Sequence, residues 1–187
     1  MKLKLVFVGV ISFLAAFDSA RGGEIPAAIQ PMSSGYHLKP VCDCFDQGST
    51  SIDLFGAYIM PHSTGDGGRD IDGSLGGGLA LTKYNNSLLG FSTGVYWWDD
   101  GDSAVTSATA SLLLRYPIRS VCVAPYAVMG FGGNFGSVSQ FTGHLGAGLE
   151  IRVPRVKNLG LFVEGTYTWA DATENYAMFR LGTRYTF

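Results

Sequence analysis

The chain has 187 residues, of which 47% are apolar and only 15% charged, and its formal net charge is −2. This length suits a single domain, and the apolar fraction is too high for an intrinsically disordered chain. No basic patch of the kind that binds nucleic acid is present. Because soluble domains usually carry charge on about a quarter of their residues, the low charge and the 26 glycines indicate that part of the surface faces something other than bulk water.

Residues 1–22 have the pattern of a secretory signal peptide. Lys2 and Lys4 form a positive start, residues 5–17 are an apolar stretch, and residues 19–22 provide small side chains for cleavage. The apolar stretch is shorter than the roughly 20 residues that span a bilayer, so a cleaved signal is preferred over an anchoring helix. Removing this segment leaves 10 basic and 14 acidic residues of the original 13 and 15.

Residues 23–50 contain three prolines and no sustained periodicity, which indicates an irregular periplasmic lead-in. From residue 51 onward, apolar residues recur with period two, as in β-strands. Turn-like breaks divide this region into eight segments: residues 51–60, 75–83, 89–97, 104–116, 121–132, 141–152, 161–169 and 176–187. Eight strands joined in sequence predict an all-β fold, an eight-stranded antiparallel up-and-down β-barrel over residues 51–187.

Such a barrel can turn its apolar face inward, as in a soluble lipocalin-like binder, or outward to lipid. Charged side chains here share one strand face with glycine, serine and threonine, which favours a transmembrane barrel with a polar lumen, the space enclosed by the strands. The predicted polar network of the lumen is Arg115, His144, Glu150, Arg152, Glu164, Arg180 and Arg184. Four arginines against two glutamates predict a net positive interior.

Aromatic residues recur near strand ends. Trp97, Trp98 and Trp169 are the three tryptophans, and all lie at the ends of predicted strands. Amphipathic rings at both membrane interfaces form the aromatic girdle of a membrane barrel. We therefore expect these three side chains to contact the lipid interface.

The last predicted strand, residues 179–187 (FRLGTRYTF), resembles the C-terminal assembly signal of bacterial outer-membrane proteins, with matches at Phe179, Leu181, Tyr185 and Phe187. Thr183 departs mildly from that signal. Residues 123–132 (VAPYAVMGFG) resemble a strand of OmpA-like and OmpX-like small barrels. The resemblance implies a bacterial outer-membrane location, with membrane lipid and the outer-membrane insertion machinery as partners.

The resemblance is weak for activity, because barrels of this class have several different functions. We expect a structural or surface-interaction role in the cell envelope, with the lumen residues acting as a plug. A narrow passive, porin-like pore is the alternative. No enzyme, cofactor or metal site is expected, because His144 has no recognisable catalytic partner in the sequence and the three histidines show no metal-ligand spacing.

The three cysteines, Cys42, Cys44 and Cys122, would all enter an oxidising compartment, and one of them must lack a partner within the chain. A bridge from Cys42 or Cys44 to Cys122 would fold the lead-in across one barrel opening. A Cys42 to Cys44 bridge is sterically awkward, and free thiols are the third alternative.

Overall fold

The computed structural model describes residues 44–45, 47–61, 73–99, 104–136, 139–153, 156, 158–171 and 175–187. The predicted signal peptide, most of the lead-in and Cys42 lie outside this part of the chain. The described strands are β1 (Thr50–Pro61), β2 (Ser74–Tyr84), β3 (Leu89–Asp99), β4 (Ala104–Arg115), β5 (Val123–Phe135), β6 (Gln140–Arg152), β7 (Leu159–Ala170) and β8 (Tyr176–Thr186).

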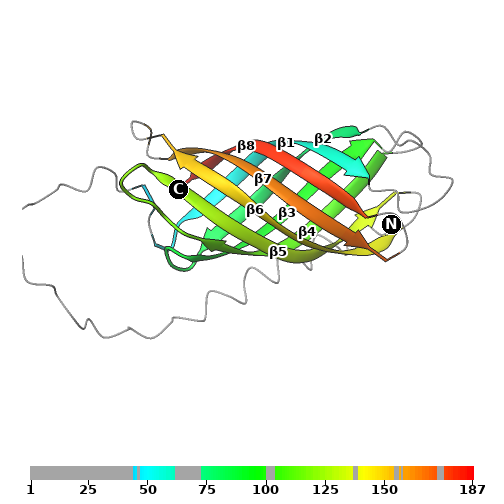
Figure 1. Cartoon of the computed structure of the whole chain (residues 1–187), viewed down its shortest axis with the longest axis horizontal. Coiled ribbons are helices and arrows are strands. Elements are labelled where there is room, and N and C mark those ends of the chain that lie inside the picture. Colours follow the sequence, from blue (N-terminus) through cyan, green and yellow to red (C-terminus); the bar gives the residue numbers. More distant parts are fainter. Residues whose placement is uncertain are drawn as a thin grey trace, which may run out of the picture. The chain divides into compact units, whose positions relative to one another are not determined.

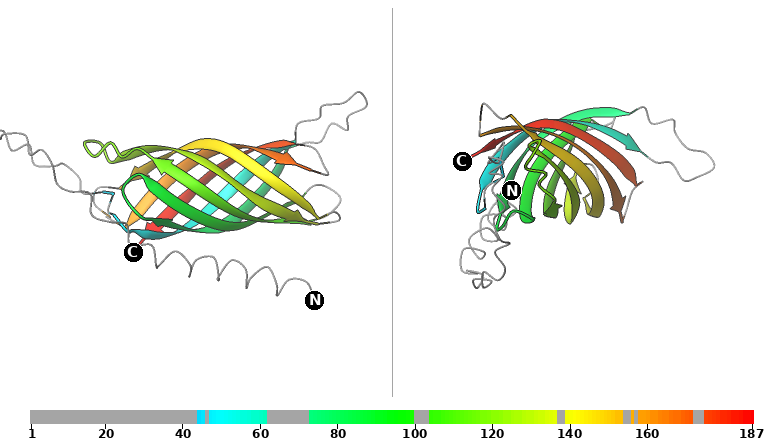
Figure 2. Two further views of the ribbon diagram at one scale, coloured as in Figure 1. Left: turned by 90° about the horizontal axis from the view of Figure 1, so that it is seen from below. Right: turned by 60° about the vertical axis from the view of Figure 1, so that its left-hand side comes forward.

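Each strand pairs antiparallel with the next, and β8 pairs with β1 to close the barrel (Figure 1). The predicted eight-stranded up-and-down fold is confirmed, and the predicted strand ends differ from the observed ones by at most three residues. Figure 2 shows that the strands are strongly tilted around the barrel. Tilt of this kind is required to close a sheet of eight strands.

Closure between β1 and β8 runs from Ser51 opposite Thr186 to Pro61 opposite Tyr176. Beyond the strand end, the backbone N–H of Phe187 donates to the carbonyl oxygen of Thr50 at 2.9 Å. The ladder therefore leaves no open sheet edge along these strands. Closure matters in lipid, where an unpaired backbone group has no water to bind.

The two ends of the barrel differ, and we name them by the chain segments found there. At the terminal mouth β1 begins and β8 ends, and at the opposite loop mouth β1 ends and β8 begins. A short turn between β2 and β3 lies at the terminal mouth. Its Asn86 side chain accepts hydrogen bonds from the backbone N–H groups of Leu88 and Leu89 at 2.8 and 2.7 Å, which is the reason asparagine suits this turn.

Successive side chains alternate between lumen and outer surface. On β6, Leu145 is half-exposed on the outside, whereas His144 and Glu150 are buried inside. The same alternation gives large exposed apolar side chains on the outer face of every strand. No helix in the described part of the chain is long and apolar enough to cross a membrane.

Several inward glycines lie directly beneath large rings. A methyl group on Gly90 would overlap the ring of Tyr84, and one on Gly148 would overlap the ring of Tyr126. Gly130 similarly leaves room for the His144 imidazole, with only 2.8 Å between an added Cβ and two ring atoms. The lumen glycines thus make room mainly for rings.

We expect Gly148→Ala to destabilise the barrel by about 1–3 kcal/mol, because the new methyl group overpacks the Tyr126 ring and a neighbouring backbone carbonyl. The matched control is Gly56→Ala on the outer face, where the nearest atom to an added Cβ is 4.0 Å away. Urea unfolding in phospholipid vesicles measures both. Equal stability of the two variants would contradict the close packing of this glycine.

Candidate functional site: the filled barrel interior

Arg184 of β8 forms the centre of the lumen charges. Its Nε and Nη2 donate to the two carboxylate oxygens of Asp53 on β1, both at 2.7 Å. Its Nη1 donates to Glu150 of β6 at 2.6 Å. All three side chains are buried. Arg184 therefore joins the closing strand pair to β6, two strands farther round the barrel, through charge-assisted hydrogen bonds.

Glu150 also forms ion pairs with two further arginines near the terminal mouth. Arg152 Nε lies 2.5 Å from Glu150 Oε1, and Arg115 Nη1 lies 3.7 Å from Glu150 Oε2. The Arg152 guanidinium additionally donates to the Thr186 hydroxyl. One carboxylate thus neutralises parts of three guanidinium groups, which lowers the cost of burying them together.

A second pair lies farther along the lumen. Arg180 of β8 forms an ion pair with Glu164 of β7, to which the Tyr126 hydroxyl donates at 3.0 Å. Glu164 faces the Arg180 backbone directly in the β7–β8 ladder. The neighbouring strand alone thus provides the counter-charge of Arg180, whereas Arg184 pairs with Asp53 on its neighbouring strand and also with Glu150 two strands away.

All seven predicted network residues lie on the lumen face, and Asp53 is the charged residue that the sequence prediction missed. Asp53 adds a third carboxylate to the predicted four arginines and two glutamates, so the interior stays net positive but by less than predicted. The surplus in this cluster is one positive charge. Asp53 was missed because β1 carries apolar residues on both faces, with Leu54 outside and Phe55 inside, so its period-two pattern does not assign the faces.

His144 has a partner that the sequence did not reveal. Its Nε2 lies 2.9 Å from the Ser111 hydroxyl, and the two residues belong to strands that flank Gly130 of β5. This pair lies within the lumen, not on the lipid-facing surface. The hydrogen bond satisfies two polar side chains that would otherwise be costly to bury.

An aromatic cluster fills the lumen toward the loop mouth. Trp98 stacks on Tyr96 with ring centroids 5.4 Å apart and lies 5.7 Å from Tyr176. The hydroxyls of Tyr96 and Tyr176 are 3.2 Å apart, and Asn134 donates to Tyr176 at 3.4 Å. Rings therefore fill the section of the lumen that the charged residues leave free.

The prediction that Trp98 belongs to the lipid-facing girdle is wrong. Trp98 is 8% exposed and points inward, whereas its neighbour Trp97 is 53% exposed on the outer face. Adjacent residues in a strand point to opposite faces, so only one of the two can face lipid. Trp169 is half-exposed on the outside, as a girdle residue would be.

A small cavity remains between the two charge clusters. It has about 10 Å³ of space for the centre of a water molecule, and its lining includes Ser92, Ser111, Asp53, Glu164 and Arg180. That space suits about one water. The lining is polar enough to hold such a water, but the cavity is too small for a hydrated ion.

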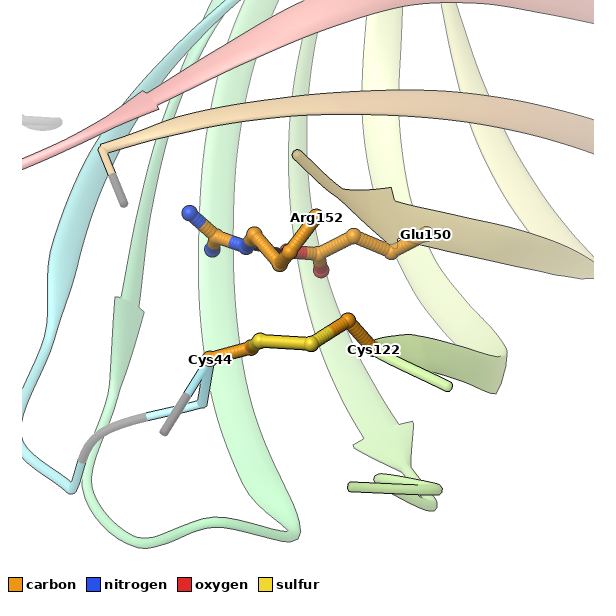
Figure 3. Close-up of a disulfide and its surroundings, with 4 residues drawn as sticks. All are labelled: Cys44, Cys122, Glu150 and Arg152. Atoms are coloured by element: carbon orange, nitrogen blue, oxygen red, sulfur yellow. Dashed lines mark ion pairs between the residues drawn. A yellow bond between two sulfur atoms is a disulfide. The ribbon is translucent and has the colours of Figure 1, made fainter. Parts of the chain in front are cut away.

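The structure joins Cys44 to Cys122, with their Cα atoms 5.8 Å apart. Cys42, the other candidate partner of Cys122, lies outside the described residues. Figure 3 shows the bridge beside the ion pair of Glu150 and Arg152 at the terminal mouth. The bridge therefore attaches the end of the lead-in to the start of β5, beside the lumen charges.

The outer face is apolar around the barrel. Half-exposed or exposed side chains there include Leu54, Leu79, Val95, Leu114, Met129, Leu145, Val163 and Leu181. The four residues of the predicted assembly signal, Phe179, Leu181, Tyr185 and Phe187, are exposed as well. A soluble barrel would hide such a surface in its interior, so the lipocalin-like alternative is wrong and the barrel is of the transmembrane type.

Known structures share this architecture. The N-terminal β-barrel domain of Pseudomonas aeruginosa OprF matches with a TM-score of 0.57 at 15% identity, over 75% of this chain and 98% of that one. Ail, the attachment invasion locus protein of Yersinia pestis, matches at 0.53 and 18%, over 75% and 99%. Neisserial surface protein A matches at 0.52 and 15%, over 74% and 96%. At these identities the likeness shows the fold.

No family model matches the sequence, and no curated protein matches it. Within the described residues, no group of three or more His, Cys, Asp and Glu side chains is placed to hold a metal ion. The polar side chains of the lumen bind one another through hydrogen bonds and ion pairs.

Proposed function

We propose that the protein is a closed barrel of the bacterial outer membrane with a structural or surface-interaction role in the envelope. The observation that carries the proposal is the Arg184 cluster, in which Asp53 of β1 and Glu150 of β6 bind one buried guanidinium inside the lumen. The aromatic cluster of Tyr96, Trp98 and Tyr176 adds a second obstruction toward the loop mouth. Because the charged cluster and the aromatic cluster each obstruct the lumen, a plugged barrel is favoured over the alternative of a narrow pore.

The proposal includes assembly by the outer-membrane insertion machinery. Phe179, Leu181, Tyr185 and Phe187 lie on the lipid-facing side at the terminal mouth and along β8. These apolar residues, interrupted on the same face by Thr183, present a hydrophobic edge to a receptor that adds strands. The Gly165 backbone beneath the Phe179 ring, with 3.3 Å between an added Cβ and that ring, keeps this part of the surface closely packed.

No reaction is part of the proposal. The Ser111 and His144 pair could serve as a nucleophile and base only if a substrate reached it. The adjoining cavity has room for about one water, and Arg180 with Glu164 lies on its wall. These contacts support a structural hydrogen bond at this position.

Recording from planar lipid bilayers tests the proposal. We expect the wild-type protein to give no current steps, because ion passage requires breaking the Arg184 contacts. A variant with Arg184→Ala, Asp53→Ala and Trp98→Ala removes the Arg184 contacts and the central ring of the aromatic cluster, and serves as the matched control in which conductance should rise. Regular steps from the wild type, with preference for anions because of the surplus positive charge, would favour the pore instead.

A further inference from the structure

Phe45, from the segment before β1, caps a buried arginine at the terminal mouth. Phe45 is 2% exposed, and the centre of its ring lies 4.9 Å from the guanidinium carbon of Arg115 and 5.8 Å from that of Arg152. The Tyr84 ring contacts the Arg115 guanidinium at 3.6 Å. Two aromatic rings therefore provide much of the packing around Arg115.

Arg115 has fewer polar partners than its burial requires. Its Nε donates to the Ser87 carbonyl oxygen at 3.3 Å, and its closest carboxylate, on Glu150, is 3.7 Å from Nη1. Within the described part of the chain, Nη1 and Nη2 have no hydrogen-bond partner. Because Glu150 is shared with Arg152 and Arg184, this end of the lumen carries surplus positive charge that an oxyanion would neutralise.

The Phe45 cap is held by the residue next to it. Cys44 precedes Phe45 in the chain and is bonded to Cys122 (Figure 3). Cys122 has a φ of 54°, a left-handed conformation that a residue other than glycine adopts at some cost. Cys122 is fully buried, whereas Cys44 is partly exposed. Cys44 is therefore the cysteine of this pair that lies nearer to solvent.

We propose that Cys44–Cys122 is a redox latch for the Phe45 cap, and that reduction uncovers Arg115 and Arg152 as a site for a small oxyanion of the phosphate class. The reductant is a dithiol. One thiolate attacks the Cys44 sulfur, Cys122 leaves and takes a proton, and the second thiol then displaces Cys44. Two electrons and two protons pass to the cysteines, and the dithiol becomes a disulfide.

The disulfide holds the cap in place because it attaches the residue next to Phe45 to the barrel wall. While the bond is intact, Phe45 is adjacent to a fixed point directly before β5 and cannot leave the mouth. After reduction, the cap keeps its ring contacts with Arg115 and Arg152 and its connection to β1, but loses its covalent bond to Cys122. Such contacts are individually weak, so water and small anions then gain access to the guanidinium groups.

Arginine modification by phenylglyoxal, followed by peptide mass spectrometry, tests the latch in the folded full-length barrel in detergent. We expect Arg115 to react slowly in the oxidised protein and severalfold faster after dithiothreitol. Exposed Arg119, in the turn before β5, reports the reagent's activity in every sample. Buried Arg184 should stay unmodified throughout, which shows that the barrel has not unfolded.

Two variants separate the latch from the cap. Phe45→Ala should make Arg115 reactive with the disulfide intact, and Cys44→Ser with Cys122→Ser should make it reactive without reductant. Inorganic phosphate should slow the reaction of Arg115, but not of Arg119, in each uncapped state. Protection in lipid-free detergent identifies a soluble anion, and protection only after adding phosphatidylglycerol identifies a lipid headgroup.

Three results would overturn the inference. If Arg115 stays unreactive in both the reduced protein and Phe45→Ala, the ring is not a cap. If Phe45→Ala uncovers Arg115 but reduction does not, the disulfide is not the latch. If neither phosphate nor the anionic lipid protects an uncovered Arg115, the oxyanion site is wrong.

Discussion

Replacing Arg184 by methionine is expected to lower the free energy of unfolding by about 3–5 kcal/mol, because it leaves buried carboxylates without their counter-charge. Asp53 would lose both of its ion-pair contacts with this side chain. Glu150 would keep Arg152 and Arg115. The loss should therefore come mainly from Asp53, and urea titration in phospholipid vesicles, read by the gel mobility of the folded form, measures it.

A double variant separates the contribution of the Arg184–Asp53 ion pair from the cost of leaving one charge buried without its partner. Replacing Arg184 by methionine and Asp53 by leucine removes both charges, so it should cost less than Arg184→Met alone. Arg119→Ala, in an exposed turn, is the control for loss of an arginine without loss of a buried contact. An Arg184→Met protein as stable as Arg119→Ala would show that the lumen network does not hold the barrel together.

The second large effect that we expect is a loss of stability when an arginine replaces a lipid-facing residue in the middle of a strand. Leu79 of β2 and Leu145 of β6 are half-exposed on the outer face, and each lies near the middle of its strand. Leu79→Arg and Leu145→Arg should each destabilise the barrel by roughly 2–4 kcal/mol, because the charge must enter the hydrocarbon core. The same unfolding titration measures both.

The control is an arginine on the same lipid-facing surface, placed at the end of a strand instead of in its middle. Tyr116 is exposed just beyond the end of β4, where a charged side chain can reach the headgroup region. Tyr116→Arg should therefore cost only about 0–1 kcal/mol. A cost that does not vary between mid-strand and strand end would contradict a bilayer around this surface.

The strands could be predicted because β2, β3, β6 and β7 each place apolar and small or polar residues on opposite faces. This pattern needs no knowledge of the partner strands. β1 and β5 were located from the turn-like breaks on either side, but their faces were not assigned, because Leu54 and Phe55 or Val128 and Met129 are apolar neighbours. Asp53 and the inward position of Tyr126 were missed for this reason.

Other features depend on the closed three-dimensional arrangement. The partner of His144 comes from β4, two strands away, so no local motif could identify Ser111. The choice between Cys42 and Cys44 depends on how the segment before β1 enters the terminal mouth. Phe45 gave no periodic signal, because a single ring inserted from a non-strand segment has no repeating neighbours.

Tryptophan quenching by phospholipids with brominated acyl chains tests most directly that the apolar face contacts lipid and the polar face is enclosed. Three single-tryptophan proteins are made by replacing the other two tryptophans with phenylalanine. Bromine quenches at short range, so Trp97 and Trp169, half-exposed on the outer face, should be quenched strongly, whereas Trp98, stacked on Tyr96 inside the lumen, should be quenched weakly. Stronger quenching of Trp98 than of Trp97 would contradict this orientation of the barrel wall.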